Sequence, residues 1–368
     1  MECGSHYYAV LALCRMLGIN KEVSYRIAYS SQFVDDALIE RVYFKRTPRG
    51  TKCHIFGKRR GLDRCATCPR IMTVWSYRHR KMTEELAPFH FIPALRGSRF
   101  QEKMRTFPDS PLLKTLMEKA LKSGDPYHVG ILLHVLGDAW AHQGFSAIIS
   151  RLNRVQGLGY VRSTVEGLDD RLVTWYLINF DGLFSRLFGR ILPMYSHSHV
   201  GLLPDIASAE WHYKYDTGKS FITHYADSGT VSNPKRYQAA FDEIADVLKR
   251  LIALHPKILG DPVAFQDISR FREQLVRPVS RSESASVWKS FLLENRFFDE
   301  HDPALYYDPH AWIRAAFRDY RKKKYTQSIV HAADPAPDFA RTDWYAFYLA
   351  AREYKEHYDL LVSRAGLF

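Results

Sequence analysis

The sequence predicts an all-α protein in which a multi-helix domain carries a C-terminal helical extension. Apolar residues recur with helical spacing along most of the chain, and strand signals are sparse. In addition, 46% of the 368 residues are hydrophobic, which is enough to bury a large core. We therefore predict one domain over residues 1–255, and an extension over residues 256–368 that packs on it rather than forming an independent domain.

Two helices are predicted near the N-terminus. Residues 6–18 are mostly apolar and end at Gly18, and glycine commonly terminates helices. A second helix is predicted over about 22–43, where apolar side chains form an inward face. Residues 45–82 contain repeated proline and glycine, so we predict a long loop or insertion there.

Helical periodicity returns further along the chain. We predict helices over residues 111–123, 127–150, 172–192, 233–251, 309–323 and 342–364. The pair Asn233 and Pro234 is typical of a helix start. Polar segments rich in proline and aspartate lie between the last helices, and we interpret them as loops.

The chain is strongly basic, with 52 Lys and Arg residues against 40 acids and a net charge of +12. Thirteen basic residues and a single acid, Asp63, lie between Arg41 and Lys81. A positive segment of this kind favours phosphate-containing partners, either nucleic acid or phospholipid, and is compatible with peripheral contact at a membrane surface. The alternative is a solvated loop that only aids solubility.

The cysteine content and the N-terminus indicate the compartment. Five cysteines, an odd number, are not typical of a secreted disulfide framework. Neither a signal peptide nor an apolar run of about 20 residues is evident, so we expect a cytoplasmic protein without a transmembrane segment. Export without a cleaved signal would leave no such trace. A small structural zinc site is a further hypothesis for Cys53, His54, Cys65 and Cys68.

The strongest functional pattern is the spacing of His134, Asp138 and His142 inside an apolar predicted helix. At about 100° per residue, steps of four and eight place the three side chains within roughly 80° of one another. Each polar group buried without a partner would cost on the order of 1–3 kcal/mol. The stripe therefore predicts either a divalent metal or a hydrogen-bond network. Three separately satisfied polar residues are the plainer alternative.

Further histidine and aspartate side chains stand in apolar surroundings elsewhere. They are His6, Asp35, Asp36, His90, His197, His199 and Asp205. Each one alone also fits an ordinary structural position, such as a helix cap or a turn. Together with the stripe, they supply the residue types of a multinuclear zinc site, in which carboxylates bridge ions and imidazoles fill the remaining positions.

These motifs resemble those of an uncharacterised bacterial helical family related to zinc-dependent phospholipase C and the fungal single-strand-specific zinc nucleases. The resemblance is carried by HYYAVLALCRMLG, SSQFVDD, PFHFIP, LHVLGDAWAHQGFS and HVGLLPD, and it extends from residue 6 to about 255. It implies an all-helical domain in which three zinc ions sit in a cleft. The basic segment would then lie near the mouth of that cleft.

The resemblance also implies a ligand set for the first ion. His134 and Asp138 would come from the central helix, with Asp138 bridging two ions. Asp35 and His90 would complete the first shell. Two ions rather than three, or another divalent metal, would fit these residue types equally well.

For the other two ions, the resemblance implies four more ligands. His6 would serve the second ion. His142 and His199, with Asp205, would hold the third.

Such a site predicts a metal-dependent phosphoesterase. Coordination lowers the pKa of bound water from 15.7 to about 7 and stabilises charge on a phosphoryl oxygen. Asp35 or Asp36 could orient the attacking water or accept its proton. Two alternatives stay open. One is a binding protein that holds nucleic acid or anionic lipid through the basic loop without turnover, and the other is a metallohydrolase acting on a different bond.

Overall fold

The structure is a computed structural model that describes residues 1–69, 81–148, 153, 155–162, 203–215, 230–260 and 267–367. Its α-helices are α1 (Val10–Met16), α2 (Lys21–Asp36), α4 (Ala87–Phe89), α5 (Phe100–Lys103), α6 (Pro111–Ser123), α7 (Pro126–Ala141), α10 (Asn233–Leu254), α11 (Ile268–Leu275), α12 (Arg281–Glu294), α13 (Ala311–Ala316), α14 (Lys322–Tyr325) and α15 (Asp343–Arg364). Short π or 3-10 turns are η1 (Gly4–Ala9), η3 (Met82–Leu86), η7 (Leu203–Asp205), η8 (Pro256–Ile258), η9 (Pro303–Leu305) and η10 (Phe339–Arg341). The described part of the chain is mostly helical, as predicted.

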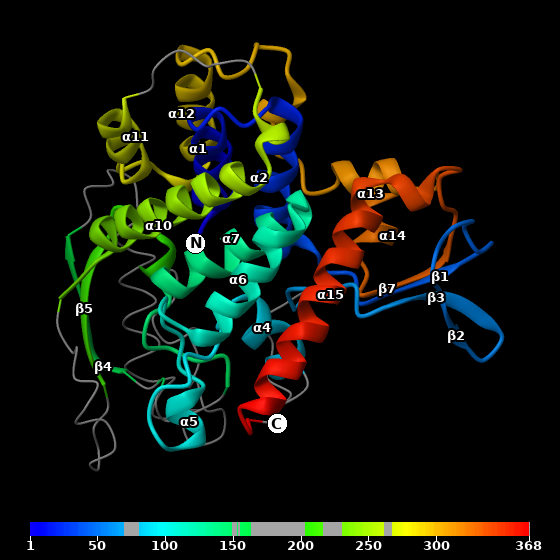
Figure 1. The fold of residues 1–368 in the computed structure, drawn as a ribbon, viewed down its shortest axis with the longest axis horizontal. Helices are drawn as coiled ribbons and strands as arrows, with labels where there is room; N and C mark the ends of the chain where they lie inside the picture. Colours follow the sequence, from blue (N-terminus) through cyan, green and yellow to red (C-terminus); the bar gives the residue numbers. More distant parts are fainter. Residues whose placement is uncertain are drawn as a thin grey trace.

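Helix α7 forms the centre of the fold. It packs along α2 and also contacts α6, α10 and α15, so that helices from distant parts of the sequence surround it (Figure 1). The side chain of Asp125 caps its first turn, and Pro126 occupies the first position, where the missing N–H costs nothing. Gly130 allows α2 to approach closely, since a Cβ there would meet the backbone of Ile27. The metal-capable stripe therefore lies in the interior.

Among the described residues, two small sheets accompany the helices, and the all-α expectation did not include them. One has the order β2 (His54–Phe56), β3 (Arg59–Asp63), β1 (Arg41–Phe44) and β7 (Ile329–Ala333). The other has the order β4 (Val155–Arg162), β5 (Glu210–Tyr215) and β6 (Thr230–Ser232). The first sheet lies at one end of the molecule, beside α15 (Figure 1).

Several predicted elements need correction. The helix predicted over 22–43 ends at Asp36, and β1 follows it. The loop predicted over 45–82 contains the β2–β3 hairpin, and the helix predicted over 309–323 is two short helices, α13 and α14. These strands are short, and β1 pairs in parallel with β7 from the far end of the chain, so local periodicity could not reveal them. The helix predicted over 172–192 lies outside the described residues.

Other boundaries agree closely with prediction. Helices α6 and α15 match the predicted ranges 111–123 and 342–364, and α10 begins at Asn233. The helix predicted over 127–150 is confirmed as α7 but ends at Ala141. Helices α11 and α12 were not predicted.

The C-terminal third contributes to the same core as the N-terminal part. The hydroxyl of Tyr7 donates a hydrogen bond to the carbonyl of Ala304 over 2.6 Å, and Tyr29 donates to the carbonyl of Asp308. Strand β7 completes the sheet that begins with β1, and Val42 and Val330 are paired and buried there. None of the described helices combines the length and apolar character needed to cross a membrane.

Candidate metal centre

The predicted stripe on α7 is buried. His134, Asp138 and His142 have exposed fractions of 0%, 2% and 5%. The helix itself ends at Ala141, but the backbone N–H of His142 still donates to the carbonyl of Asp138. The structure therefore brings all three polar residues into the interior, where each needs a partner.

A first group of ligand-type atoms surrounds one carboxylate oxygen of Asp138. The Oδ2 atom lies 3.2 Å from Nδ1 of His90 and 3.2 Å from Nε2 of His134. Asp35, at the end of α2, places its Oδ1 atom 3.7 Å and 3.8 Å from the same two nitrogens. His90 directly follows α4, so three separate segments converge here.

Backbone carbonyls set the orientation of both rings. Nδ1 of His134 lies 2.8 Å from the carbonyl of Ser31, and Nε2 of His90 lies 3.2 Å from the carbonyl of Thr67. A carbonyl only accepts, so each of these nitrogens carries a hydrogen. In the neutral rings the opposite nitrogens then hold lone pairs, and these nitrogens face each other across 3.2 Å. Such an arrangement requires a proton or a cation among them, and carbonyl-anchored histidines are typical of metal ligands.

A second group uses the other oxygen of Asp138. Oδ1 lies 3.1 Å from Nε2 of His6 and 2.6 Å from the amino group of Met1. The ring of His6 stacks on that of His134, with centroids 3.9 Å apart. Gly137 helps to make room, because a Cβ there would lie 3.5 Å from His6 and 3.2 Å from Met1.

Two groups satisfy the spacing that a single ion needs. Within the described residues, they are His6 with His134 and Asp138, and Asp35 with His90 and His134, and in each group the ligand atoms lie within 4.8 Å of one another. His134 belongs to both groups, and the carboxylate of Asp138 has one oxygen toward each. The buried His and Asp residues of this centre could therefore hold a metal.

A pair formed by His142 and Asp205 lies beside these two groups. Nε2 of His142 is 2.9 Å from Oδ1 of Asp205, which is also 3.1 Å from the Met1 amino group. The ring of Phe91 stacks on His142 at 4.9 Å. His197 and His199, two further predicted candidates, lie outside the described residues.

Burial and neighbouring charges shift the pKa values of three groups in the centre. Burial opposes ionisation of Asp138, but the Met1 amino group, His134 and His142 hold its pKa well below the usual value. Burial lowers the pKa of His6 to about 3, and the neighbouring His134 contributes to this. Burial opposes a charge on His90, but its hydrogen bonds to Asp138 and Cys68 and the nearby carboxylate of Asp35 together hold its pKa well above the usual value, so this ring must lose a proton before it binds a metal.

Asp36 lies apart from this centre. Its Oδ2 atom accepts hydrogen bonds from Tyr307 over 2.7 Å and from Gln32 over 3.1 Å. Burial raises the pKa of this carboxyl. Of the two adjacent aspartates, Asp35 faces the histidines and Asp36 faces the C-terminal part of the chain.

The suggested cysteine site is not assembled. The side chain of His54 contacts Arg352, and the Cys53 sulfur contacts Thr51. Neither group of metal-capable side chains found among the described residues includes a cysteine. Cys68 instead lies beside His90, where burial raises the pKa of its thiol.

Two features of the centre escaped prediction. The anchoring groups at Ser31 and Thr67 are backbone carbonyls, which any residue type provides, so no side-chain pattern signals them. The Met1 amino group likewise belongs to no motif.

Comparisons with known proteins add one finding. The sequence profile of a family of unknown function, DUF6765, matches residues 1–359. Neither a curated protein nor a solved structure matches the chain.

Proposed function

The chain belongs to the DUF6765 family, and we propose from the site itself that it is a metal-dependent hydrolase that cleaves phosphoesters. The observation that carries the proposal is the position of Asp138, a buried carboxylate with each oxygen directed at a different set of imidazoles. A carboxylate that bridges two ions needs this arrangement. Two-ion sites are typical of enzymes that transfer or hydrolyse phosphoryl groups.

The residues divide into roles under this proposal. His90 and His134 would hold one ion with Asp35, and His6 would hold a second, with Asp138 between them. His142 and Asp205 offer a third position. Zinc suits the mixture of imidazole and carboxylate, and another divalent metal remains an alternative.

The chemistry follows from charge. When bound, divalent ions lower the pKa of coordinated water to about 7 and stabilise negative charge on a phosphoryl oxygen. Asp35 is the more exposed carboxylate of the centre, at 31% against 2% for Asp138, so it is the better placed to orient water or to accept its proton. Asp36 accepts a hydrogen bond from Tyr307 instead, so under this proposal it does not act on the water.

We extend the proposal to the fold. The central helix with its buried ligand stripe, surrounded by other helices, is the arrangement expected of the phospholipase C and zinc nuclease relatives suggested by the motifs. The sheet formed by β1, β2, β3 and β7 would then be an addition to that helical core.

Metal content and hydrolysis test the proposal together. Purified protein should contain at least two divalent ions per chain and should hydrolyse bis(p-nitrophenyl) phosphate. Asp138→Asn should lose both bound metal and activity, since it removes the bridging charge but keeps the side-chain volume. Asp246→Asn, an exposed aspartate on α10, is the matched control and should change neither.

Two outcomes would contradict the proposal. Full metal content and activity in Asp138→Asn would remove the bridging role. Bound metal without hydrolysis of phosphodiester, single-stranded nucleic acid or phosphatidylcholine would indicate a metal-stabilised protein with another function.

A further inference from the structure

The four-stranded sheet presents one face to the core and the other outward. Val42, Leu62 and Val330 point inward and are buried. Side chains alternate between faces along a strand, so their neighbours Arg41, Tyr43 and the residues paired with them lie on the outer face.

Aromatic rings and arginines alternate on it. The rings of Tyr43 and His331 stack at 5.3 Å, and Phe56 meets Tyr43 edge-on at 5.5 Å. The guanidinium of Arg41 lies 4.5 Å from the centre of the Phe56 ring, and that of Arg59 lies 5.5 Å from the Tyr43 ring. Three adjacent strands and β7 thus build one platform, which we define as Arg41, Tyr43, Phe56, Arg59 and His331.

Additional positive charge surrounds the platform. Besides Arg59, six cations between residues 45 and 60 are exposed, and that stretch contains no acid: Lys45, Arg46, Arg49, Lys52, Lys58 and Arg60. A second exposed basic run, Arg321 to Lys323, comes from the far end of the chain. This run lies beside the sheet, because the following residue, Lys324, donates a hydrogen bond to the carbonyl of Ala332 at the end of β7. The parallel pairing of β1 with β7 therefore gathers two distant basic runs at one sheet.

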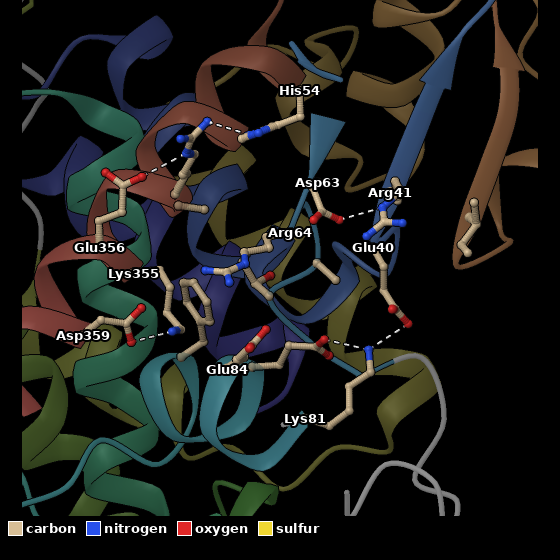
Figure 2. A pocket seen from close by; sticks show the side chains of 17 residues that line it. Glu40, Arg41, His54, Asp63, Arg64, Lys81, Glu84, Lys355, Glu356 and Asp359 are labelled. Atoms are coloured by element: carbon tan, nitrogen blue, oxygen red, sulfur yellow. Dashed lines mark hydrogen bonds and ion pairs between the residues drawn. The ribbon is translucent and has the colours of Figure 1, made fainter. Parts of the chain in front are cut away.

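The platform continues into a cavity of about 520 Å³ between the sheet and α15. Figure 2 shows Arg41, Asp63 and His54 on the cavity side of the sheet, with Arg64 among them. Five acidic groups in the wall have an ion-pair partner: Asp63 pairs with Arg41, Glu40 and Glu85 pair with Lys81, Glu356 pairs with Arg352, and Asp359 pairs with Lys355. Arg64 is exposed and has a left-handed backbone with φ of 56°, a conformation that costs a non-glycine residue energy.

We propose that this platform binds single-stranded nucleic acid. Rings on an open sheet face can stack on unpaired bases, and arginines between the rings can stack as well as pair with phosphates. The surrounding cations would contact the phosphate backbone, and Arg64 would receive a phosphate at the cavity. Binding of this kind requires no metal and no hydrolysis, so the inference does not depend on the proposed function.

The alternative polyanion, an anionic membrane, fits the surface less well. Insertion into a bilayer requires exposed apolar side chains in addition to the attraction of basic residues to anionic lipids. Ile55 is 70% exposed, but it pairs with Arg60 and lies on the face opposite the aromatic rings. The rings of Tyr43, Phe56 and His331 lie across the sheet with Arg41 and Arg59 next to them, and this arrangement suits stacking on bases better than insertion into a bilayer.

Fluorescence anisotropy tests the inference on the full-length protein. The probes are a labelled 12-nucleotide single strand with phosphorothioate linkages, the corresponding duplex, and vesicles containing phosphatidylglycerol. Single-strand affinity should exceed duplex affinity. If the protein contacts about five phosphates, its affinity for the single strand should fall roughly 100-fold between 50 and 200 mM salt.

Variants separate stacking from charge. Phe56→Ala should weaken single-strand binding by roughly fivefold to a hundredfold with little change in the salt dependence, because one stacking ring is lost. Arg59→Lys keeps the charge but loses the planar group, so it should weaken binding less than Arg59→Ala. Lys122→Ala, an exposed lysine on α6, removes the same charge elsewhere and should change binding little. Far-ultraviolet circular dichroism would verify that each variant is folded.

Three results would overturn the inference. The first is equal affinity for the single strand and the duplex. The second is unchanged single-strand binding by folded Phe56→Ala and Arg59→Ala. The third is binding to the vesicles with no binding to the single strand. Hydrolysis of bis(p-nitrophenyl) phosphate, measured in parallel, should be unaffected by the platform variants. A protein that binds the strand but hydrolyses nothing would refute the proposed function and leave this inference in place.

Discussion

Two glycines in α7 should differ in how much their replacement by alanine changes stability. A Cβ at Gly130 would collide with the carbonyl of Ile27 and would come within 2.5 Å of Cβ of Ser30 and 3.0 Å of the backbone nitrogen of Ser31. These are mostly backbone atoms, so no side-chain rotation can relieve the contact. At Gly137 the nearest atoms are the flexible sulfur of Met1 at 3.2 Å and a ring carbon of His6 at 3.5 Å.

The expected magnitudes follow from two opposing effects. Alanine in a helix interior is about 1 kcal/mol more favourable than glycine. Overpacking costs roughly 1–3 kcal/mol, and the upper end applies where backbone must move. We therefore expect Gly130→Ala to lower the free energy of unfolding by about 2 kcal/mol, and Gly137→Ala to change it by less than about 1 kcal/mol in either direction.

Equilibrium urea unfolding, followed by circular dichroism, measures both changes. Displacement of α2 at Gly130 would also move the Ser31 carbonyl that orients His134, so the metal affinity of Gly130→Ala should fall as well. If Gly130→Ala were as stable as Gly137→Ala, the close approach of α2 and α7 would be wrong. If it were destabilised but bound metal normally, the carbonyl of Ser31 would not position the ligand.

Three further predictions concern charge and position. In chelator-treated protein, the lowered pKa of Asp138 stabilises the folded state at pH values above the unfolded pKa near 3.8. This stabilisation is lost as the pH falls below that value. The free energy of unfolding should therefore fall more steeply with acid than it does in Asp138→Asn. Because His90 has a raised pKa, metal uptake near neutral pH should release a proton, measurable by calorimetry in buffers of different ionisation enthalpy; zero release would contradict a protonated His90. Tyr307→Phe should lower the free energy of unfolding in urea by roughly 1.5–3 kcal/mol, because Asp36 loses a charge-assisted hydrogen bond. The metal content of this variant should not change. A loss of metal would instead place Asp36 within the centre.

Much of the centre was predictable from local spacing. A helix repeats every 3.6 residues, so the intervals between His134, Asp138 and His142 determine that they share a face whatever the rest of the chain does. The apolar residues between them indicate that this face is buried. The candidate list of separate histidines and aspartates was predictable for the same reason, since ionisable residues in apolar segments need partners.

Other features depended on contacts between distant segments. Asp35 and Asp36 are adjacent and chemically identical, and only the end of α2 relative to His90 and Tyr307 decides which one faces the histidines. The carbonyl of Thr67, which orients His90, likewise has no counterpart in side-chain patterns. The cysteines near it suggested a separate zinc site that the geometry does not assemble.

The sequence by itself determined the predominance of helix, the buried stripe and the strong positive charge, because these depend on composition and on neighbours within a few turns. Only the tertiary structure decided where the charge gathers and what lies beside it. The sheet that joins Tyr43 and Phe56 to His331 forms through pairing of β1 with β7, strands at opposite ends of the chain. Such pairing is determined by the packing of the whole molecule, and a pattern read along one segment carries no information about it.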